Sequence, residues 1–136
     1  MTSADQAQID QIIAKFFGAF DNRNGRTPSL DELTRLFAPG AIVVHDTGAK
    51  CENYTVAQFA QPRLQLLASG ELVDFHEWET DFSTEITRSV ALRNSSYRKQ
   101  GMLNRRPYVG GGKKFFQLGR FDSGWRISAL AWSDDR

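Results

Sequence analysis

The sequence has one cysteine, Cys51, and only two histidines, His45 and His76. A single cysteine cannot form a disulfide within the chain, which is typical of proteins in a reducing compartment. So few potential ligands, with no His–Cys spacing typical of zinc, predict no metal site, and no motif predicts a cofactor. A Gly-x-Ser-x-Gly elbow is also missing, so the sequence does not support nucleophilic catalysis by serine.

Long hydrophobic runs and a strong net charge are missing too. No apolar stretch approaches the roughly 18–20 residues of a membrane helix. The opening residues, MTSADQAQIDQ, have neither the basic nor the apolar region of a signal peptide. The net charge is +1, which gives no general reason to expect binding to nucleic acid or membranes. We therefore predict a cytoplasmic protein that binds neither.

The charges that are present fall into two blocks. Residues 71–85 contain six acidic residues and no Lys or Arg, whereas residues 87–121 contain nine basic residues and no acid. The basic block could form a face for an anionic ligand. Because the two blocks adjoin, we favour the alternative that they pair across neighbouring antiparallel strands.

Hydrophobic periodicity divides the chain into two parts. Up to about residue 70 the spacing predicts helices in the first 20 residues, from Pro28-Ser29, and from Thr55, with a strand over 41–46. Pro62 should kink or split the third helix. The period then falls to about two and predicts strands over 72–84, 89–99, 113–121 and 125–132. The Gly-Gly-Gly-Lys-Lys segment at 110–114 is predicted to be a flexible hairpin loop, since it lacks the spacing of a phosphate-binding loop.

Helices followed by hairpin-linked strands indicate a single α+β domain over residues 1–136, with a curved antiparallel sheet wrapped around three N-terminal helices. A sheet that curls around helices leaves a cavity at one end. We therefore expect a ligand pocket between the helices and the concave face of the sheet.

Two stretches carry a resemblance to a known family: Leu-Phe-Ala-Pro-Gly-Ala-Ile-Val at 36–43 and Gly-Trp-Arg-Ile at 124–127. Together with the order of the predicted helices and strands, these two stretches resemble the nuclear transport factor 2-like superfamily. The resemblance is strongest to its SnoaL-like polyketide cyclase and ketosteroid isomerase branch. The resemblance implies a cone-shaped, cystatin-like roll. It also implies a homodimer formed through the open face of the sheet.

The catalytic pattern of ketosteroid isomerases is only partly matched. The resemblance places His45, eight residues after Phe37, where the family has its proton-shuttling aspartate. An imidazole can do the same task, since histidine titrates near neutral pH. The family's oxyanion-binding tyrosine falls on Phe16, which cannot donate, and its protonated aspartate falls on Phe116 or Gln117. Asp46 should point to the opposite face from His45.

Three hypotheses remain open. The favoured one is a binding domain for a small, mostly apolar ligand. The second is an enzyme of isomerase, cyclase or dehydratase type with His45 as acid/base, and the third is a non-catalytic dimeric interaction module. Aromatic and polar side chains that suit a pocket are the predicted ligand-binding set: Phe16, Phe20, Tyr54, Phe59, Trp78, Arg93, Tyr97, Gln117 and Trp132.

Overall fold

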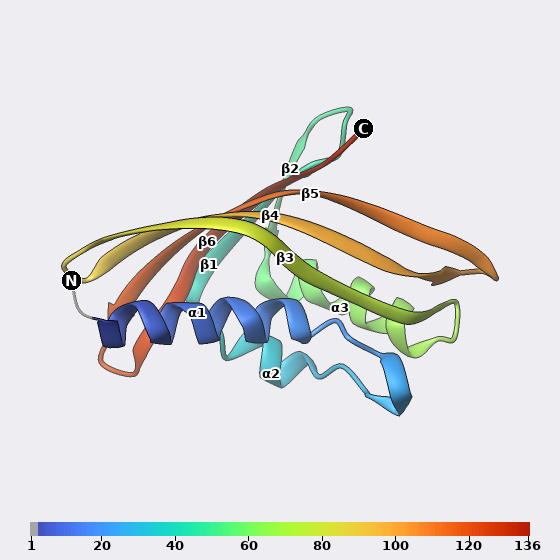
Figure 1. The fold of residues 1–136 in the computed structure, drawn as a ribbon, viewed down its shortest axis with the longest axis horizontal. Helices are drawn as coiled ribbons and strands as arrows, with labels where there is room; N and C mark the ends of the chain where they lie inside the picture. The colour runs from blue at the N-terminus through green and yellow to red at the C-terminus, as the bar shows by residue number, and fades with distance from the viewer. Residues whose placement is uncertain (1–2) are drawn as a thin grey trace.

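The computed structural model describes residues 3–136, which form three α-helices beside one six-stranded sheet. The helices are α1 (Ser3–Gly18), α2 (Leu30–Thr34) and α3 (Val56–Ala68), with a short 3-10 turn, η1 (Arg23–Gly25). The strands are β1 (Phe37–Asp46), β2 (Cys51–Thr55), β3 (Leu72–Thr87), β4 (Val90–Leu103), β5 (Arg106–Phe121) and β6 (Gly124–Asp134). All three helices lie on one side of the curved sheet (Figure 1). The predicted α+β architecture is confirmed.

The sheet order is β2-β1-β6-β5-β4-β3, so the last strand lies between the first and the fifth. Every neighbouring pair is antiparallel except β1 and β6, which run parallel. The sequence reading predicted an antiparallel sheet and missed β2. That strand is short, and its Cys-Glu-Asn-Tyr-Thr sequence carries little hydrophobic alternation.

The glycine run belongs to strand β5, so the predicted hairpin loop at 110–114 is wrong. The chain reverses instead at Asn104 and Arg105, whose φ angles of 50° and 70° suit the tight turn of a two-residue hairpin. The glycines are required by close approach of backbone. A Cβ on Gly112 would lie 2.2 Å from the carbonyl oxygen of Ser133, and one on Gly111 would lie 2.5 Å from that of Tyr97.

Helix α3 is one helix from Val56 to Ala68, although Pro62 lies inside it. Its start is fixed by a capping box, in which Thr55 accepts from the Gln58 amide and the Gln58 side chain accepts from the Thr55 amide. Of the two outcomes predicted for Pro62, a kink or a split, the split is wrong because the helix is continuous. The intact helix carries Phe59 and Arg63 along one side.

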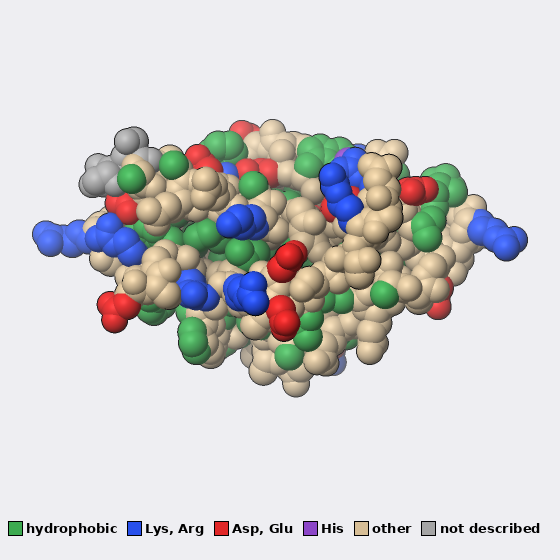
Figure 2. Space-filling view, turned by 90° about the horizontal axis from the view of Figure 1, so that it is seen from below, with side chains coloured by type: hydrophobic (Ala, Val, Ile, Leu, Met, Phe, Trp, Pro, Cys, Tyr) green, Lys and Arg blue, Asp and Glu red, His purple; other side chains and the backbone are tan. Residues whose placement is uncertain are grey.

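The core fills the space between the helices and the concave face. Phe16 is fully buried at its centre, with five phenylalanine rings 5.1–6.4 Å from its own: Phe17, Phe20, Phe37, Phe59 and Phe116. Seen from below, from the helix side, the molecule shows charges of both signs scattered among apolar side chains (Figure 2). None of the helices formed by residues 3–136 has the length and hydrophobicity needed to span a bilayer.

Candidate functional site

A cavity of about 210 Å³ lies between α3 and the concave face of the sheet. Its apolar walls are Phe20, Phe59, Leu66, Leu67, Leu72, Phe75 and Trp132. Its polar and charged walls are His45, Arg63, Glu77, Tyr97, Lys99, Tyr108, Lys114 and Asp134. The lining is therefore about half polar, which differs from the mostly apolar pocket expected.

His45 lies on the inner face of β1, with its side chain 15% exposed. Its ring stacks on the indole of Trp132, with 3.9 Å between ring centroids, and its Nε2 lies 3.4 Å from Oδ2 of Asp134. Burial lowers the pKa of His45 below its usual value and outweighs the opposing effect of Asp134. Asp46 points to the other face, where it contacts Ser133 and Arg136, as predicted. The result is an imidazole at the cavity that is neutral at pH 7.

Asp134 is the meeting point of three polar groups. It accepts a hydrogen bond from the phenol of Tyr97, and Lys99 Nζ lies 3.5 Å from its Oδ1. Burial alone would raise the pKa of Asp134. The hydrogen bond from Tyr97 and the charges of Lys99 and Lys114 outweigh that effect, so its pKa is lowered. Asp134 is thus a carboxylate that contacts His45, Tyr97 and Lys99 on one side of the cavity.

Two further cations line the same cavity without a carboxylate partner. Lys114 is only 4% exposed, and its Nζ lies 4.2 Å from the ring centroid of Tyr97 and 4.8 Å from that of Trp132. Arg63 lies over the rings of Phe59 and Trp132 and donates to the Phe59 carbonyl. Within residues 3–136, neither side chain has a carboxylate within 4.0 Å. Both cations lie over aromatic rings, whose faces attract positive charge.

Burial lowers the pKa of both cations. It lowers the pKa of Lys114 to about 8, with Glu77 and Asp134 opposing the shift and Lys99 and Arg63 adding to it. Burial also lowers the pKa of Arg63. A protonated amine in this position is costly unless an anion neutralises it.

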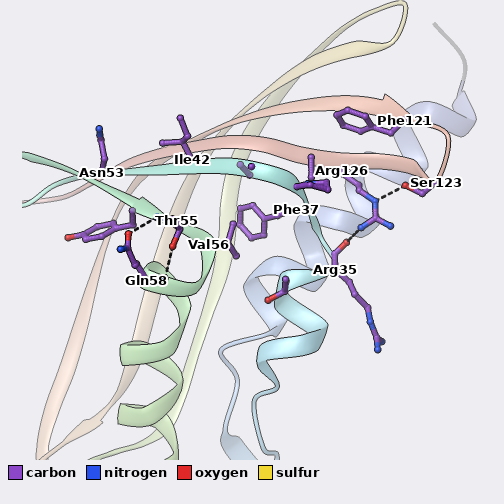
Figure 3. A pocket seen from close by; sticks show the side chains of 16 residues that line it. Arg35, Phe37, Ile42, Asn53, Thr55, Val56, Gln58, Phe121, Ser123 and Arg126 are labelled. Atoms are coloured by element: carbon purple, nitrogen blue, oxygen red, sulfur yellow. Dashed lines mark hydrogen bonds between the residues drawn. The ribbon is translucent and has the colours of Figure 1, made fainter.

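A wider groove, of about 930 Å³, runs along β1 and β2 to the start of α3 (Figure 3). The hydrogen bonds drawn in Figure 3 stabilise the protein's own structure around the groove. They are the Thr55–Gln58 capping box and the bonds that Arg126 donates to Ser123 and to the Arg35 carbonyl. Tyr54 lines this groove and donates to Glu52. Because these polar groups already have partners, we take the smaller cavity as the candidate site.

Half of the predicted site residues line that cavity: His45, Phe20, Phe59, Tyr97 and Trp132. The other five do not, and their placement is corrected as follows. Phe16 is packed in the core, and Tyr54 lies in the wider groove. Trp78 is 36% exposed and stacks on His76.

Arg93 and Gln117 are also misplaced by the sequence reading. Arg93 is buried, but Glu79, Asp10 and Thr84 occupy its guanidinium at distances of 2.6–3.0 Å. Gln117 is exposed on the outer face, where it donates to Ser128. The adjacent residue, Phe116, is the one that faces inward.

One residue of the basic block pairs with the acidic block, and two others line the cavity. Arg93 of the basic block pairs with Glu79 of the acidic block across β4 and β3, as the favoured alternative predicted. Lys99 and Lys114 of the same block face the cavity instead. Sequence reasoning missed these two and Arg63, Glu77, Tyr108 and Asp134. For Lys114 a signal existed, since the two-residue period puts it on the face of Phe116 and Leu118.

No protein-family model matches this sequence. No curated protein matches it either. Solved structures are similar in fold at low identity. A nuclear transport factor 2-like superfamily protein from Salmonella enterica is 14% identical, with a TM-score of 0.79 over 100% of this chain and 94% of the other.

Two further structures agree. The Kfla4162 protein from Kribbella flavida is 15% identical, with a TM-score of 0.78 over 98% of this chain and 92% of the other. A protein of unknown function with a cystatin-like fold from Nostoc punctiforme is 11% identical, with a TM-score of 0.70 over 99% and 94%. The SnoaL-like branch stays a prediction. The chain has the nuclear transport factor 2-like fold, in its cystatin-like α+β form.

Proposed function

We propose that this protein binds a small organic anion, such as a single-ring carboxylate, in the cavity between α3 and the sheet. The observation that carries the proposal is the pair of cations, Arg63 and Lys114, which lie against aromatic rings with no carboxylate partner among residues 3–136. An incoming carboxylate would supply that partner.

The charge balance of the cavity supports an anion. Three cationic side chains (Arg63, Lys99 and Lys114) and two carboxylates (Glu77 and Asp134) line it, so 3 − 2 leaves one positive charge while His45 is neutral. Asp134 is already engaged by Tyr97, Lys99 and His45. The excess charge therefore falls on the Arg63 and Lys114 side.

The volume limits the size of the ligand. A buried cavity of about 150 Å³ accommodates benzene, so about 210 Å³ suits one ring with a small substituent. Phe59, Trp132 and Tyr97 offer ring faces to it. A ligand with one apolar ring and one anionic group matches both kinds of wall.

Calorimetric titration with benzoate tests the proposal, with benzylamine as the ligand of opposite charge. We expect benzoate to bind, and Lys114→Met to weaken it about tenfold or more because a buried ionic contact is lost. Lys113→Met is the matched control, since Lys113 is the neighbouring residue on the exposed face of β5. Equal binding of benzoate and benzylamine, or equal affinity in the two variants, would contradict the proposal.

An acid/base enzyme is the second candidate, favoured by the placement of His45. Its imidazole is neutral, lines the cavity and lies beside the carboxylate of Asp134. Such a group can move a proton on a ketone. Exchange of the α-protons of phenylacetone in D2O should be faster with the protein and return to the uncatalysed rate in His45→Ala. No acceleration by the wild-type protein would remove this candidate for such ketones.

A homodimer through the outer sheet face remains a prediction. What supports it is the exposure of large apolar side chains there: Ile42 at 51%, Leu92 at 51% and Phe115 at 48%. Light scattering at about 50 µM should give twice the chain mass. Phe115→Lys should shift it to the monomer, whereas Val109→Lys, at an exposed residue near the β4–β5 turn, should not. A wild-type monomer would contradict the prediction.

A further inference from the structure

Lys114 combines three features. It is 4% exposed, its amine lines a cavity large enough for a ring, and it has no hydrogen-bond or ion-pair partner among residues 3–136. Its neighbours in the strand register are Ser95 on β4 and Trp132 on β6. A buried amine held this way is available to a molecule in the cavity.

We propose that Lys114 forms an imine with a small aldehyde or ketone that enters this cavity. The inference rests on the proposed function, because the carbonyl compound must occupy the same space as the organic anion. It narrows the ligand class to small oxo acids, in which Arg63 would hold the carboxylate and Lys114 would react with the carbonyl carbon.

The chemistry balances without another reactant. The lone pair of Lys114 Nζ attacks the carbonyl carbon, the C=O π electrons move to oxygen, and a proton passes from nitrogen to that oxygen to give a carbinolamine. Loss of the hydroxyl as water, with the remaining nitrogen proton, forms the C=N bond. One amine and one carbonyl thus give one imine and one water, and hydrolysis reverses the step.

The environment of Lys114 favours the unprotonated amine that this attack requires. Burial sets its pKa at about 8, so about half of the amine is a free base at pH 8. A lysine in water, at a pKa of about 10.4, is less than about 1% unprotonated at that pH. Neighbouring cations, here Lys99 and Arg63, act in the same direction.

Proton-carrying groups share the cavity. His45 stacks on Trp132, which is the register neighbour of Lys114, and the Lys114 amine lies 4.2 Å from the ring centroid of Tyr97. A neutral imidazole can take the proton from nitrogen and return it to the leaving hydroxyl. His45 is thus given a role that does not require it to act on the substrate carbon.

Reductive trapping tests the inference. The full chain is incubated with 4-formylbenzoate and sodium cyanoborohydride at pH 7.5, and peptide mass mapping locates the reduced adduct among the five lysines. We expect labelling of Lys114 at least about tenfold faster than labelling of Lys113. The rate at Lys114 should level off above pH 8, where most of its amine is already unprotonated.

Variants make the outcome decisive. Lys114→Met should lose the adduct, Lys113→Met should keep it, and circular dichroism checks that both are folded. Should Lys114→Met fail to fold, excess benzoate should slow labelling of wild-type Lys114 and leave Lys113 unaffected. Uniform labelling of all lysines would overturn the imine. Benzoate binding without trapping would overturn the imine alone, whereas trapping that benzoate does not slow would overturn the proposed anion site.

Discussion

The phenol of Tyr97 donates a hydrogen bond to the carboxylate of Asp134 across an intervening strand. Tyr97 is on β4 and Asp134 on β6, and the residue of β5 that pairs with both is Gly112. Because Gly112 has no side chain, the tyrosine can reach over β5. This contact ties three strands together and orients Asp134 toward His45 and Lys99.

Replacing Gly112 by alanine should therefore be strongly destabilising. The new Cβ would lie 2.2 Å from the Ser133 carbonyl oxygen and 2.9 Å from the Asp134 Cα, and both are backbone atoms that cannot rotate away. We expect a loss of about 2 kcal/mol or more in the free energy of unfolding, measured by urea denaturation. Gly18→Ala is the control, because nothing lies within 4 Å of its Cβ and Gly18 is helical, so it should leave stability unchanged or raise it by up to about 1 kcal/mol. Equal effects in the two variants would show that β5 can shift away from β6.

The buried guanidinium of Arg93 should depend on Glu79. Glu79 accepts from Nε and Nη2 of Arg93 at 3.0 and 2.7 Å, and also from Ser95. Glu79→Ala leaves the buried cation with Asp10 as its carboxylate partner, and should cost about 3 kcal/mol in the free energy of unfolding. Glu85→Ala, at an exposed residue of the same strand, should cost less than about 0.5 kcal/mol in the same urea experiment. A small effect at Glu79 would mean that Asp10 and Thr84 suffice for Arg93.

Lys114→Met should stabilise the fold while weakening the proposed binding of an anion. The pKa of Lys114 is about 8 in the folded protein against 10.5 in the unfolded chain. As the pH falls from 10.5 to 8, the unfolded chain binds the proton first, so this residue makes the folded state less stable. We expect the variant to be more stable than the wild type by about 1–3 kcal/mol at pH 7, with the difference shrinking toward pH 10.5. If the stability difference between the variant and the wild type is the same at pH 7 and pH 10.5, the amine is not desolvated in the folded protein.

Acid should weaken the fold through Asp21. Arg23 donates to its carboxylate and Arg26 adds a second ion pair, so the pKa of Asp21 is lowered to about 2 from 3.8. A lowered carboxyl pKa contributes stability above pH 3.8, and this contribution is lost as the pH falls toward 2. Thermal melts from pH 5 to pH 2 should show this decline, and Asp21→Asn should show a shallower one. Parallel curves for the two proteins would assign the acid sensitivity to other carboxyl groups.

The sequence predicted the layout well because hydrophobic spacing is a local property. The two-residue period after Val43 correctly turned His45 inward and Asp46 outward. The prediction failed where a shift of one residue exchanges the two faces of a strand. Gln117 was predicted to face the cavity, whereas its neighbour Phe116 is the residue that points inward from β5. Lys114 was missed although it alternates with the buried Phe116 and Leu118, because the adjacent glycine run was read as a loop and not as part of the strand.

Other parts of the site were beyond local patterns. Arg63 and Glu77 line the same cavity only because α3 packs opposite β3, and nothing in the sequence of either segment specifies that packing. The ion pairs of Arg93 could not be predicted for the same reason, since its carboxylate partners come from two distant elements, α1 and β3. The two charge blocks indicated that acidic and basic residues of neighbouring strands could form ion pairs. They did not indicate which basic residues would stay without a carboxylate partner.

The strand order also has a consequence for the way the chain folds. Strand β6 follows the other five strands of this sheet in the sequence, yet it lies between β1 and β5 and joins the β1–β2 hairpin to the β3–β4–β5 meander. Both pieces can form as the chain leaves the ribosome, but each keeps an open edge until β6 arrives. The Tyr97–Asp134 contact and most of the cavity wall near His45 must then form in one late step that brings distant segments together. Folding should be slow for a domain of this size. Until β6 has left the ribosome, the unpaired edges of β1 and β5 should stay exposed and prone to aggregation.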